Sequence, residues 1–257
     1  MRTLAVLGDS TGVGVGDPVA GGGWRGFPPL LANALGADLV NLARNGARLG
    51  CLRTEQLPLA IRARPDAAVV FAGINDSLRS DFDKERLGAD LDTVVSTLTG
   101  SGALVVTVRY HDHGRIFRLP GPLRRALANR IHDINTIVDD VSLRYGTGVV
   151  DLDVLPGTYL QAAWSVDRLH PSESGHRMLA RALAESFASA GALVPADVSL
   201  ECAGSRPISQ LDRLGWMVYK GIPWLWRRGQ DLVPYALGVL IEGWFRPTAP
   251  GQPAEPA

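Results

Sequence analysis

Short runs of aliphatic and β-branched residues recur along the chain, and the segments between them carry apolar residues at helical spacing. The runs lack the polar–apolar alternation of a half-exposed strand, so each is typical of a strand buried on both faces. Strands that alternate with helices in this way favour a parallel sheet covered by helices on both faces. The runs that we interpret as strands are residues 3–7, 37–42, 67–73, 103–108 and 148–152.

Four of the remaining segments are expected to be helices, because their apolar residues repeat every three or four positions. The last of them follows Ser172, a residue type that commonly caps the N-terminus of a helix. The expected helices cover roughly residues 27–34, 87–98, 122–145 and 173–190. The sequence therefore predicts an α/β protein with a five-stranded parallel sheet between two helical layers.

The composition of the chain changes after this α/β unit, which we expect to end near Pro195. Residues 196–246 interleave tryptophan with arginine and lysine and are interpreted as a short, Trp-rich helical extension. Residues 247–257 are rich in proline and alanine and are expected to be disordered. The predicted organisation is thus a domain over residues 1–195, an extension over 196–246 and a tail over 247–257.

The amphipathic extension has three interpretations that the sequence leaves open. It packs on its own domain, forms a homodimer contact, or lies peripherally on a membrane surface. Its most apolar stretch, Leu232 to Phe245, is shorter than the roughly 18 residues that a transmembrane helix needs and contains Pro234 and Glu242. No transmembrane segment is therefore expected.

Charge and cysteine content restrict the partners and the compartment. Lys and Arg number 26, as do Asp and Glu, so no overall field favours nucleic acid or an anionic membrane, and any charged partner must be recognised locally. Cys51 and Cys202 have no partners at the spacing of metal ligands. Two cysteines so far apart are also weak evidence for a disulfide, which fits a reducing compartment. Met1 precedes the first strand almost directly, leaving no room for a signal peptide, and a cytoplasmic location is expected.

Chemically distinctive residues follow three of the predicted strands and precede the last helix. Ser10 follows the first strand in "GDS", Gly46 follows the second in "NLARNG", and Asn75 follows the third in "GIND". Asp167 and His170 belong to "DRLH", in the loop before the final helix. Because ligands bind at the carboxyl ends of parallel strands, these residues are expected to meet there.

Together these residue types suit acyl transfer. A nucleophilic serine needs a base and a group that orients the base, roles for which Ser10, His170 and Asp167 are the candidates. The developing oxyanion needs donors, which the backbone N–H groups of Ser10 and Gly46 and the side-chain amide of Asn75 would supply. A glycine suits the second position because it lets a backbone donor approach the substrate.

The four blocks resemble the SGNH, or GDSL-type, hydrolase family, with Ser10, Gly46, Asn75 and His170 as its name-giving residues. The resemblance covers roughly residues 2–190, and Thr11 departs from it by standing where the family name has leucine. It implies a flavodoxin-like three-layer α/β/α sandwich with strand order 2-1-3-4-5. It also implies serine esterase chemistry on a small ester, without a metal or an organic cofactor.

Some interpretations remain beside this one. Ser10 alone fits a helix N-cap equally well. His111, His113 and Arg115 follow the fourth strand and are interpreted as a loop that lines the substrate, because a metal site would lack a third clear ligand. The predicted function is ester hydrolysis through an acyl-enzyme. The alternatives are an acyltransferase or carbohydrate O-deacetylase with the same site, or a non-catalytic binding domain.

Overall fold

Parallel strands form a single five-stranded sheet in the part of the chain that the computed structural model describes, residues 1–116 and 121–202. The strand order is β2-β1-β3-β4-β5, which is the order of flavodoxin-like folds. This confirms the predicted fold class. The strands are β1 (Thr3–Gly8), β2 (Asp38–Asn41), β3 (Ala67–Phe71), β4 (Leu104–Arg109) and β5 (Gly148–Asp151).

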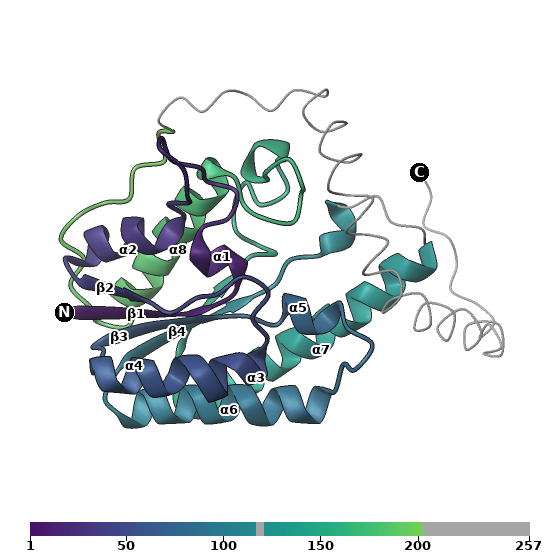
Figure 1. Ribbon diagram of the computed structural model, residues 1–257, viewed down its shortest axis with the longest axis horizontal. Helices are drawn as coiled ribbons and strands as arrows, with labels where there is room; N and C mark the ends of the chain where they lie inside the picture. The colour runs from purple at the N-terminus through teal and green to yellow at the C-terminus, as the bar shows by residue number, and fades with distance from the viewer. Residues whose placement is uncertain (117–120, 203–257) are drawn as a thin grey trace.

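Helices cover both faces of the sheet (Figure 1). On one face α2 (Phe27–Leu35) packs against α8 (Glu173–Ser189). On the other face α6 (Lys84–Gly100) packs against α7 (Gly121–Tyr145). The residues of β3 are buried throughout, as expected for a central strand between two helical layers.

The predicted helices are present, and their buried faces follow the apolar periodicity. In α6 the buried apolar residues are Leu87, Leu91, Val94, Val95 and Leu98. Ser172 is the N-cap of α8, as predicted, and its hydroxyl accepts a hydrogen bond from the Gly175 N–H.

Between β2 and β3 the chain forms helical structure that the sequence analysis did not assign. It consists of α3 (Leu49–Cys51), a π-helical turn (Leu52–Gln56) and α4 (Leu57–Ala63). The π turn shifts the helical register, so no regular period marks the segment. The turn buries Gln56, whose side-chain amide donates to the Gly8 carbonyl at 2.9 Å and accepts from the Gly8 N–H at 2.8 Å. Gln56 thereby holds the end of β1.

The described chain remains attached to the α/β unit beyond Pro195. Val198 is buried in the core, and its carbonyl accepts hydrogen bonds from the Arg181 guanidinium. Arg177 likewise donates to the Ser199 carbonyl at 2.9 Å. The rest of the predicted extension and the whole tail lie outside the described residues, so the division into 1–195, 196–246 and 247–257 stays a prediction.

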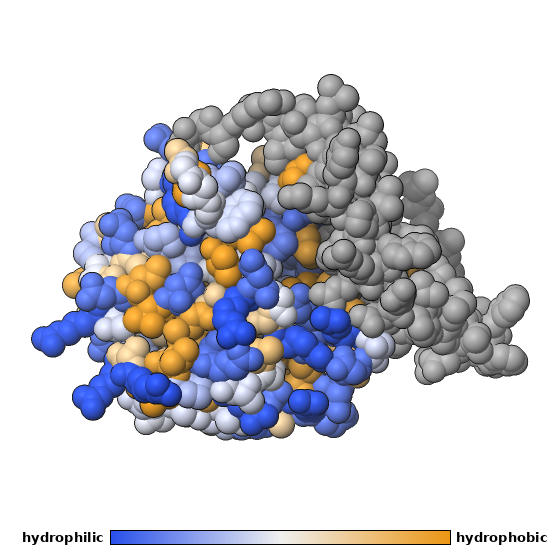
Figure 2. Space-filling view, in the orientation of Figure 1, coloured by the Kyte–Doolittle hydropathy of each residue, from blue (hydrophilic) through white to orange (hydrophobic). Residues whose placement is uncertain are grey.

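No helix within residues 1–116 and 121–202 has the length and apolar character to cross a membrane. On the face shown in Figure 2, hydrophilic and hydrophobic side chains are intermixed.

The packing of α8 on the sheet is expected to contribute strongly to stability. Leu183 is fully buried in α8, so Leu183→Ala should lower the free energy of unfolding by about 2–5 kcal/mol through lost burial and a residual cavity. Leu143→Ala, at a position that is 87% exposed, is the matched control and should cost less than about 0.5 kcal/mol. Urea unfolding of both variants measures the difference, and equal losses would contradict this account of the core.

Candidate active site

Two hydrogen bonds connect the predicted nucleophile, base and acid. His170 Nε2 lies 2.7 Å from Ser10 Oγ, and His170 Nδ1 lies 2.6 Å from Asp167 Oδ2. With the Nδ1–H tautomer, the imidazole donates to the carboxylate and accepts from the serine hydroxyl. The structure therefore brings Ser10, from the end of β1, to His170 and Asp167 in the loop before α8.

Ser10 is the first residue of the short helix α1 (Ser10–Val13) and does not cap it. The N-cap is Asp9, whose carboxylate accepts a hydrogen bond from the Thr11 N–H at 2.9 Å. The interpretation of Ser10 as a helix cap is therefore wrong. Its hydroxyl turns to His170 instead, and its backbone N–H is one of the first N–H groups of α1, which have no acceptor within the helix.

Asp167 is held as a carboxylate by several donors. Its Oδ1 accepts from the backbone N–H groups of Leu169 and His170, both at 2.9 Å, and from the Ser165 hydroxyl at 2.6 Å. Burial acts to raise the pKa of Asp167, but the hydrogen bonds and the charge of His170 outweigh it and hold that pKa at about 2. Asp167 is thus anionic throughout the neutral pH range and fixes the imidazole ring.

Gly46 and Asn75, the other predicted oxyanion donors, follow β2 and β3, the two strands that flank β1 in the sheet. Asn75 lies in α5 (Ile74–Ser77) and donates from Nδ2 to the carbonyl of Ala47, next to Gly46, at 3.1 Å. Gly46 has φ of 75°, and a Cβ there would meet no atom within 4 Å. Its need for glycine therefore comes from the left-handed backbone rather than from crowding by the protein.

An ion pair between the buried Asp76 carboxylate and the partly exposed Arg48 guanidinium holds these two segments together. Asp76 accepts from Arg48 Nε at 2.9 Å and from the Leu49 N–H at 3.2 Å, which ties the segment after Gly46 to α5. Burial raises the pKa of Asp76, although its bonds to Arg48 and Leu49 oppose the shift. The sequence analysis missed Asp76, and its only signal was its position directly after Asn75.

Asp9 is a second buried carboxylate at this edge of the sheet. Its side chain is almost fully buried, and burial raises its pKa to about 6, against the lowering effects of the Thr11 N–H and the charge of His170. Its Oδ2 lies 3.5 Å from Asn75 Nδ2, at the long limit of a hydrogen bond. Asp9 therefore lies beside the amide of Asn75 and interacts electrostatically with His170.

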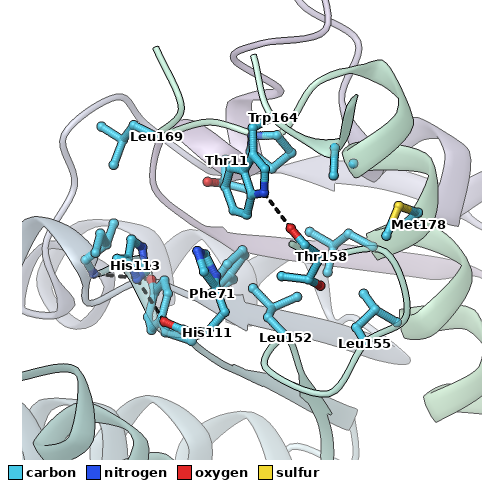
Figure 3. Close-up of a pocket in the computed structure, with 16 residues that line it drawn as sticks. Thr11, Phe71, His111, His113, Leu152, Leu155, Thr158, Trp164, Leu169 and Met178 are labelled. Atoms are coloured by element: carbon cyan, nitrogen blue, oxygen red, sulfur yellow. Dashed lines mark hydrogen bonds between the residues drawn. The ribbon is translucent and has the colours of Figure 1, made fainter. Parts of the chain in front are cut away.

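His111 and His113 line a cavity of about 50 Å³ at the carboxyl edge of the sheet (Figure 3). Their rings stack with centroids 4.1 Å apart, and both side chains are buried. Burial lowers the pKa of His111 to about 2 and that of His113 to about 4, so both rings are neutral at pH 7. Arg115, grouped with them as a substrate-binding residue, does not line this cavity. Its guanidinium lies 3.4 Å from the centre of the Tyr159 ring.

Metal ligands are not grouped in the part of the chain that the structure describes. Within residues 1–116 and 121–202, no cluster of three or more His, Cys, Asp or Glu side chains is arranged to hold a metal ion.

Solved structures share this fold at low sequence identity. An α/β hydrolase, LAE5, from the metagenome of Lake Arreo is 22% identical, with a TM-score of 0.59 over 73% of this chain and 95% of its own. The acetylxylan esterase Axe2 from Geobacillus stearothermophilus is 20% identical, with a TM-score of 0.58 over 72% and 94%. TesA is 20% identical, with a TM-score of 0.57 over 72% and 98%. These likenesses show a common fold.

The family assignment comes from a family model. None of the curated proteins matches this chain. The model of the GDSL-like lipase/acylhydrolase family matches residues 6–178, a range that contains Ser10, Gly46, Asn75, Asp167 and His170. The chain therefore belongs to the GDSL-like lipase/acylhydrolase family and is an esterase- or lipase-like hydrolase.

Proposed function

We propose that this hydrolase cleaves carboxylic esters with Ser10 as the nucleophile, through an acyl-enzyme intermediate. The observation that carries the proposal is the chain of hydrogen bonds from Ser10 Oγ through His170 to Asp167, at 2.7 and 2.6 Å. A serine paired with an oriented imidazole is the arrangement that activates a hydroxyl for attack on a carbonyl carbon.

The reaction has two halves that use the same base. Ser10 Oγ attacks the ester carbonyl carbon while His170 Nε2 takes the hydroxyl proton, and Asp167 stabilises the imidazolium. His170 then gives this proton to the departing alkoxide, which leaves as the alcohol. In the second half His170 deprotonates a water that attacks the acyl-enzyme, and Ser10 leaves with that proton as the carboxylic acid is released.

Three donors are proposed for the oxyanion of both tetrahedral intermediates. They are the backbone N–H groups of Ser10 and Gly46 and one N–H of the Asn75 amide. One Asn75 N–H is held by the Ala47 carbonyl at 3.1 Å, whereas the 3.5 Å approach to Asp9 is weak. The second N–H is therefore the one that turns to the substrate oxygen.

The buried carboxylate of Asp9 acts on this mechanism through its negative charge near His170. The charge of His170 lowers the pKa of Asp9, so the two side chains are close enough for an ionised Asp9 to attract a positive charge on the imidazole. Because the imidazolium forms in the transition state, a buried anion near it stabilises that state relative to the free enzyme.

A carbohydrate O-deacetylase is the second candidate function. It would use the same residues, and it is favoured by the likeness in fold to an acetylxylan esterase. An acyltransferase would differ only in the acceptor that attacks the acyl-enzyme. The cytoplasmic location and the contacts of residues 203–246 remain predictions from the sequence.

Removal of the nucleophile or the base is the most direct test. Ser10→Ala and His170→Ala should each lower kcat on p-nitrophenyl acetate by at least about 1000-fold, because the hydroxyl is lost or is no longer activated. Ser10→Ala should also abolish covalent labelling by a fluorophosphonate. Ser189→Ala, at an exposed position late in α8, is the matched control and should keep full turnover. Unchanged turnover in Ser10→Ala would refute the mechanism.

The oxyanion role of Asn75 predicts a loss confined to the chemical step. Asn75→Ala should lower kcat by about 100- to 1000-fold with little change in KM, because one transition-state donor is removed. Asn33→Ala, at an exposed position in α2, provides the control. A loss of less than about threefold would exclude Asn75 from the oxyanion site.

The raised pKa of Asp9 predicts a pH-dependent stability. The folded protein binds the Asp9 proton more tightly than the unfolded chain does, so the ionised carboxylate destabilises the fold above pH 6. Asp9→Asn should therefore raise the free energy of unfolding by up to about 3 kcal/mol at pH 8, and this gain should shrink below pH 6 and vanish near pH 4. Asp38→Asn, at an exposed position, is the control.

Urea unfolding at pH 8, 6 and 4.5 measures this gain, and steady-state kinetics at pH 8 should show a lower kcat for Asp9→Asn. A gain that does not depend on pH would mean that Asp9 is not a buried anion in the native protein.

A further inference from the structure

A cavity of about 50 Å³ lies at the carboxyl edge of the sheet, between the loops that carry Ser10, Asn75 and His170. Its walls include the chain neighbours of the reactive residues. Thr11 follows Ser10, Ile74 precedes Asn75, and Leu169 and Pro171 flank His170. An acyl group bound to Ser10 would therefore have this cavity beside it.

Apolar and aromatic side chains form most of the cavity wall. Phe71 contributes from the end of β3, Leu152 and Leu155 from the segment after β5, and Met178 from α8 (Figure 3). A wall of this kind favours a hydrocarbon group, because burying apolar surface is the main source of binding energy in such a site.

Trp164 is fixed in position and limits the size of the cavity. It is 8% exposed, and its indole Nε1–H donates to the Thr158 carbonyl at 2.6 Å. Its ring packs against His111 with centroids 4.6 Å apart. Because the indole is held on one side by a hydrogen bond and on the other by a ring, the cavity does not widen by a simple rotation of this side chain.

The volume of the cavity sets the length of the group that it admits. A cavity of about 150 Å³ accommodates the six carbons of benzene. A cavity one third of that size has room for about two carbons, so it admits an acyl chain of about one to three carbons beyond the carbonyl carbon. A longer chain would require walls that are already packed to move, and overpacking of this kind is unfavourable.

The polar residues of the wall carry no charge at neutral pH. Burial lowers the pKa of His111 and His113 far below 7 and raises the pKa of Tyr110 well above its usual value. Neither ring nitrogen of His111 has a hydrogen-bond partner among the described residues. A carboxylate placed here would lose its hydration without meeting a cation, which is costly.

We propose that this cavity is the acyl-binding pocket and that it restricts the enzyme to esters of uncharged acyl groups of about two to four carbons. This inference rests on the function proposed above, since it assumes that Ser10 carries the acyl group.

A series of p-nitrophenyl esters tests the size limit. On acetate, propionate, butyrate, hexanoate and decanoate, kcat/KM should fall by at least about tenfold between butyrate and hexanoate, because each additional methylene meets a filled wall. The hemisuccinate ester, with as many acyl carbons as butyrate but a terminal carboxylate, should also be hydrolysed at least about tenfold less efficiently than butyrate.

Enlargement of the pocket provides the second half of the test. Leu155→Ala should raise the hexanoate-to-butyrate ratio of kcat/KM by about fivefold or more. Leu39→Ala is a matched control, because both leucines are partly buried and pack on the core but Leu39 does not line the cavity. It should leave the ratio unchanged. If melting shows that Leu155→Ala does not fold, Met178→Ala makes the same enlargement from α8.

The possible results separate this inference from the proposed function. Hexanoate hydrolysed as well as butyrate, or equal ratios in Leu155→Ala and Leu39→Ala, would overturn the acyl-pocket assignment while leaving the serine mechanism intact. Fluorophosphonate labelling of Ser10 is independent of acyl length. Absence of both labelling and turnover in the folded protein would overturn the proposed function, and the acyl pocket with it.

Discussion

The carboxyl edge of the sheet depends on carboxylates that are buried or largely buried and therefore need hydrogen-bond donors there. Asp9, Asp76 and Asp167 each lie in or beside the loops of the site, and a buried carboxylate is tolerated only when donors replace its water. Burial raises the pKa of each and hydrogen-bond donors lower it; burial outweighs the donors of Asp9 and Asp76 but not those of Asp167. Asp167, with the imidazole, a hydroxyl and two backbone N–H groups, has a lowered pKa, whereas Asp9, with one strong backbone donor, has a raised pKa. The ionised form of Asp167 is therefore stabilised by its donors, whereas the ionised form of Asp9 is destabilised by burial.

The same requirement ties the loops of the site to one another. A buried carboxylate left without its donors costs several kcal/mol, so each one fixes the chain segments that supply the donors. Asp17 and Glu173 both bind Arg25, which joins the loop after α1 to the first turn of α8. Gly16, in that loop, lies so close to the Pro171 carbonyl that a Cβ would approach its oxygen to 2.0 Å. The loops on either side of the reactive serine and histidine are thus held together by charge and by close backbone contact.

The sequence predicted features that have a regular period or a short local pattern. The five strands alternate with periodic helices, and the blocks around Ser10 and His170 each have recognisable neighbours, so the fold and the residues that meet at the sheet edge could be expected. The roles of Gln56 and Asp76 could not be predicted, because a buried polar residue leaves no periodic signal and its partners are distant in the chain. The π-helical turn before α4 was not predicted for a related reason, because it interrupts the periodicity on which helix prediction depends.

Trp164 of the cavity wall and His170, the proposed base, lie in one loop, so the proposed acyl specificity is coupled to the proposed catalysis. Trp164 pairs with Pro171 in an isolated antiparallel bridge, and the next residue, Ser165, donates its backbone N–H to the His170 carbonyl at 2.9 Å. A substitution that moves Trp164 would therefore also move the residues that orient His170. Leu155 lies earlier in the chain, outside this bridge. On the proposed mechanism, a substitution at Leu155 alters acyl preference without displacing His170, whereas a substitution at Trp164 alters both the cavity and the position of His170.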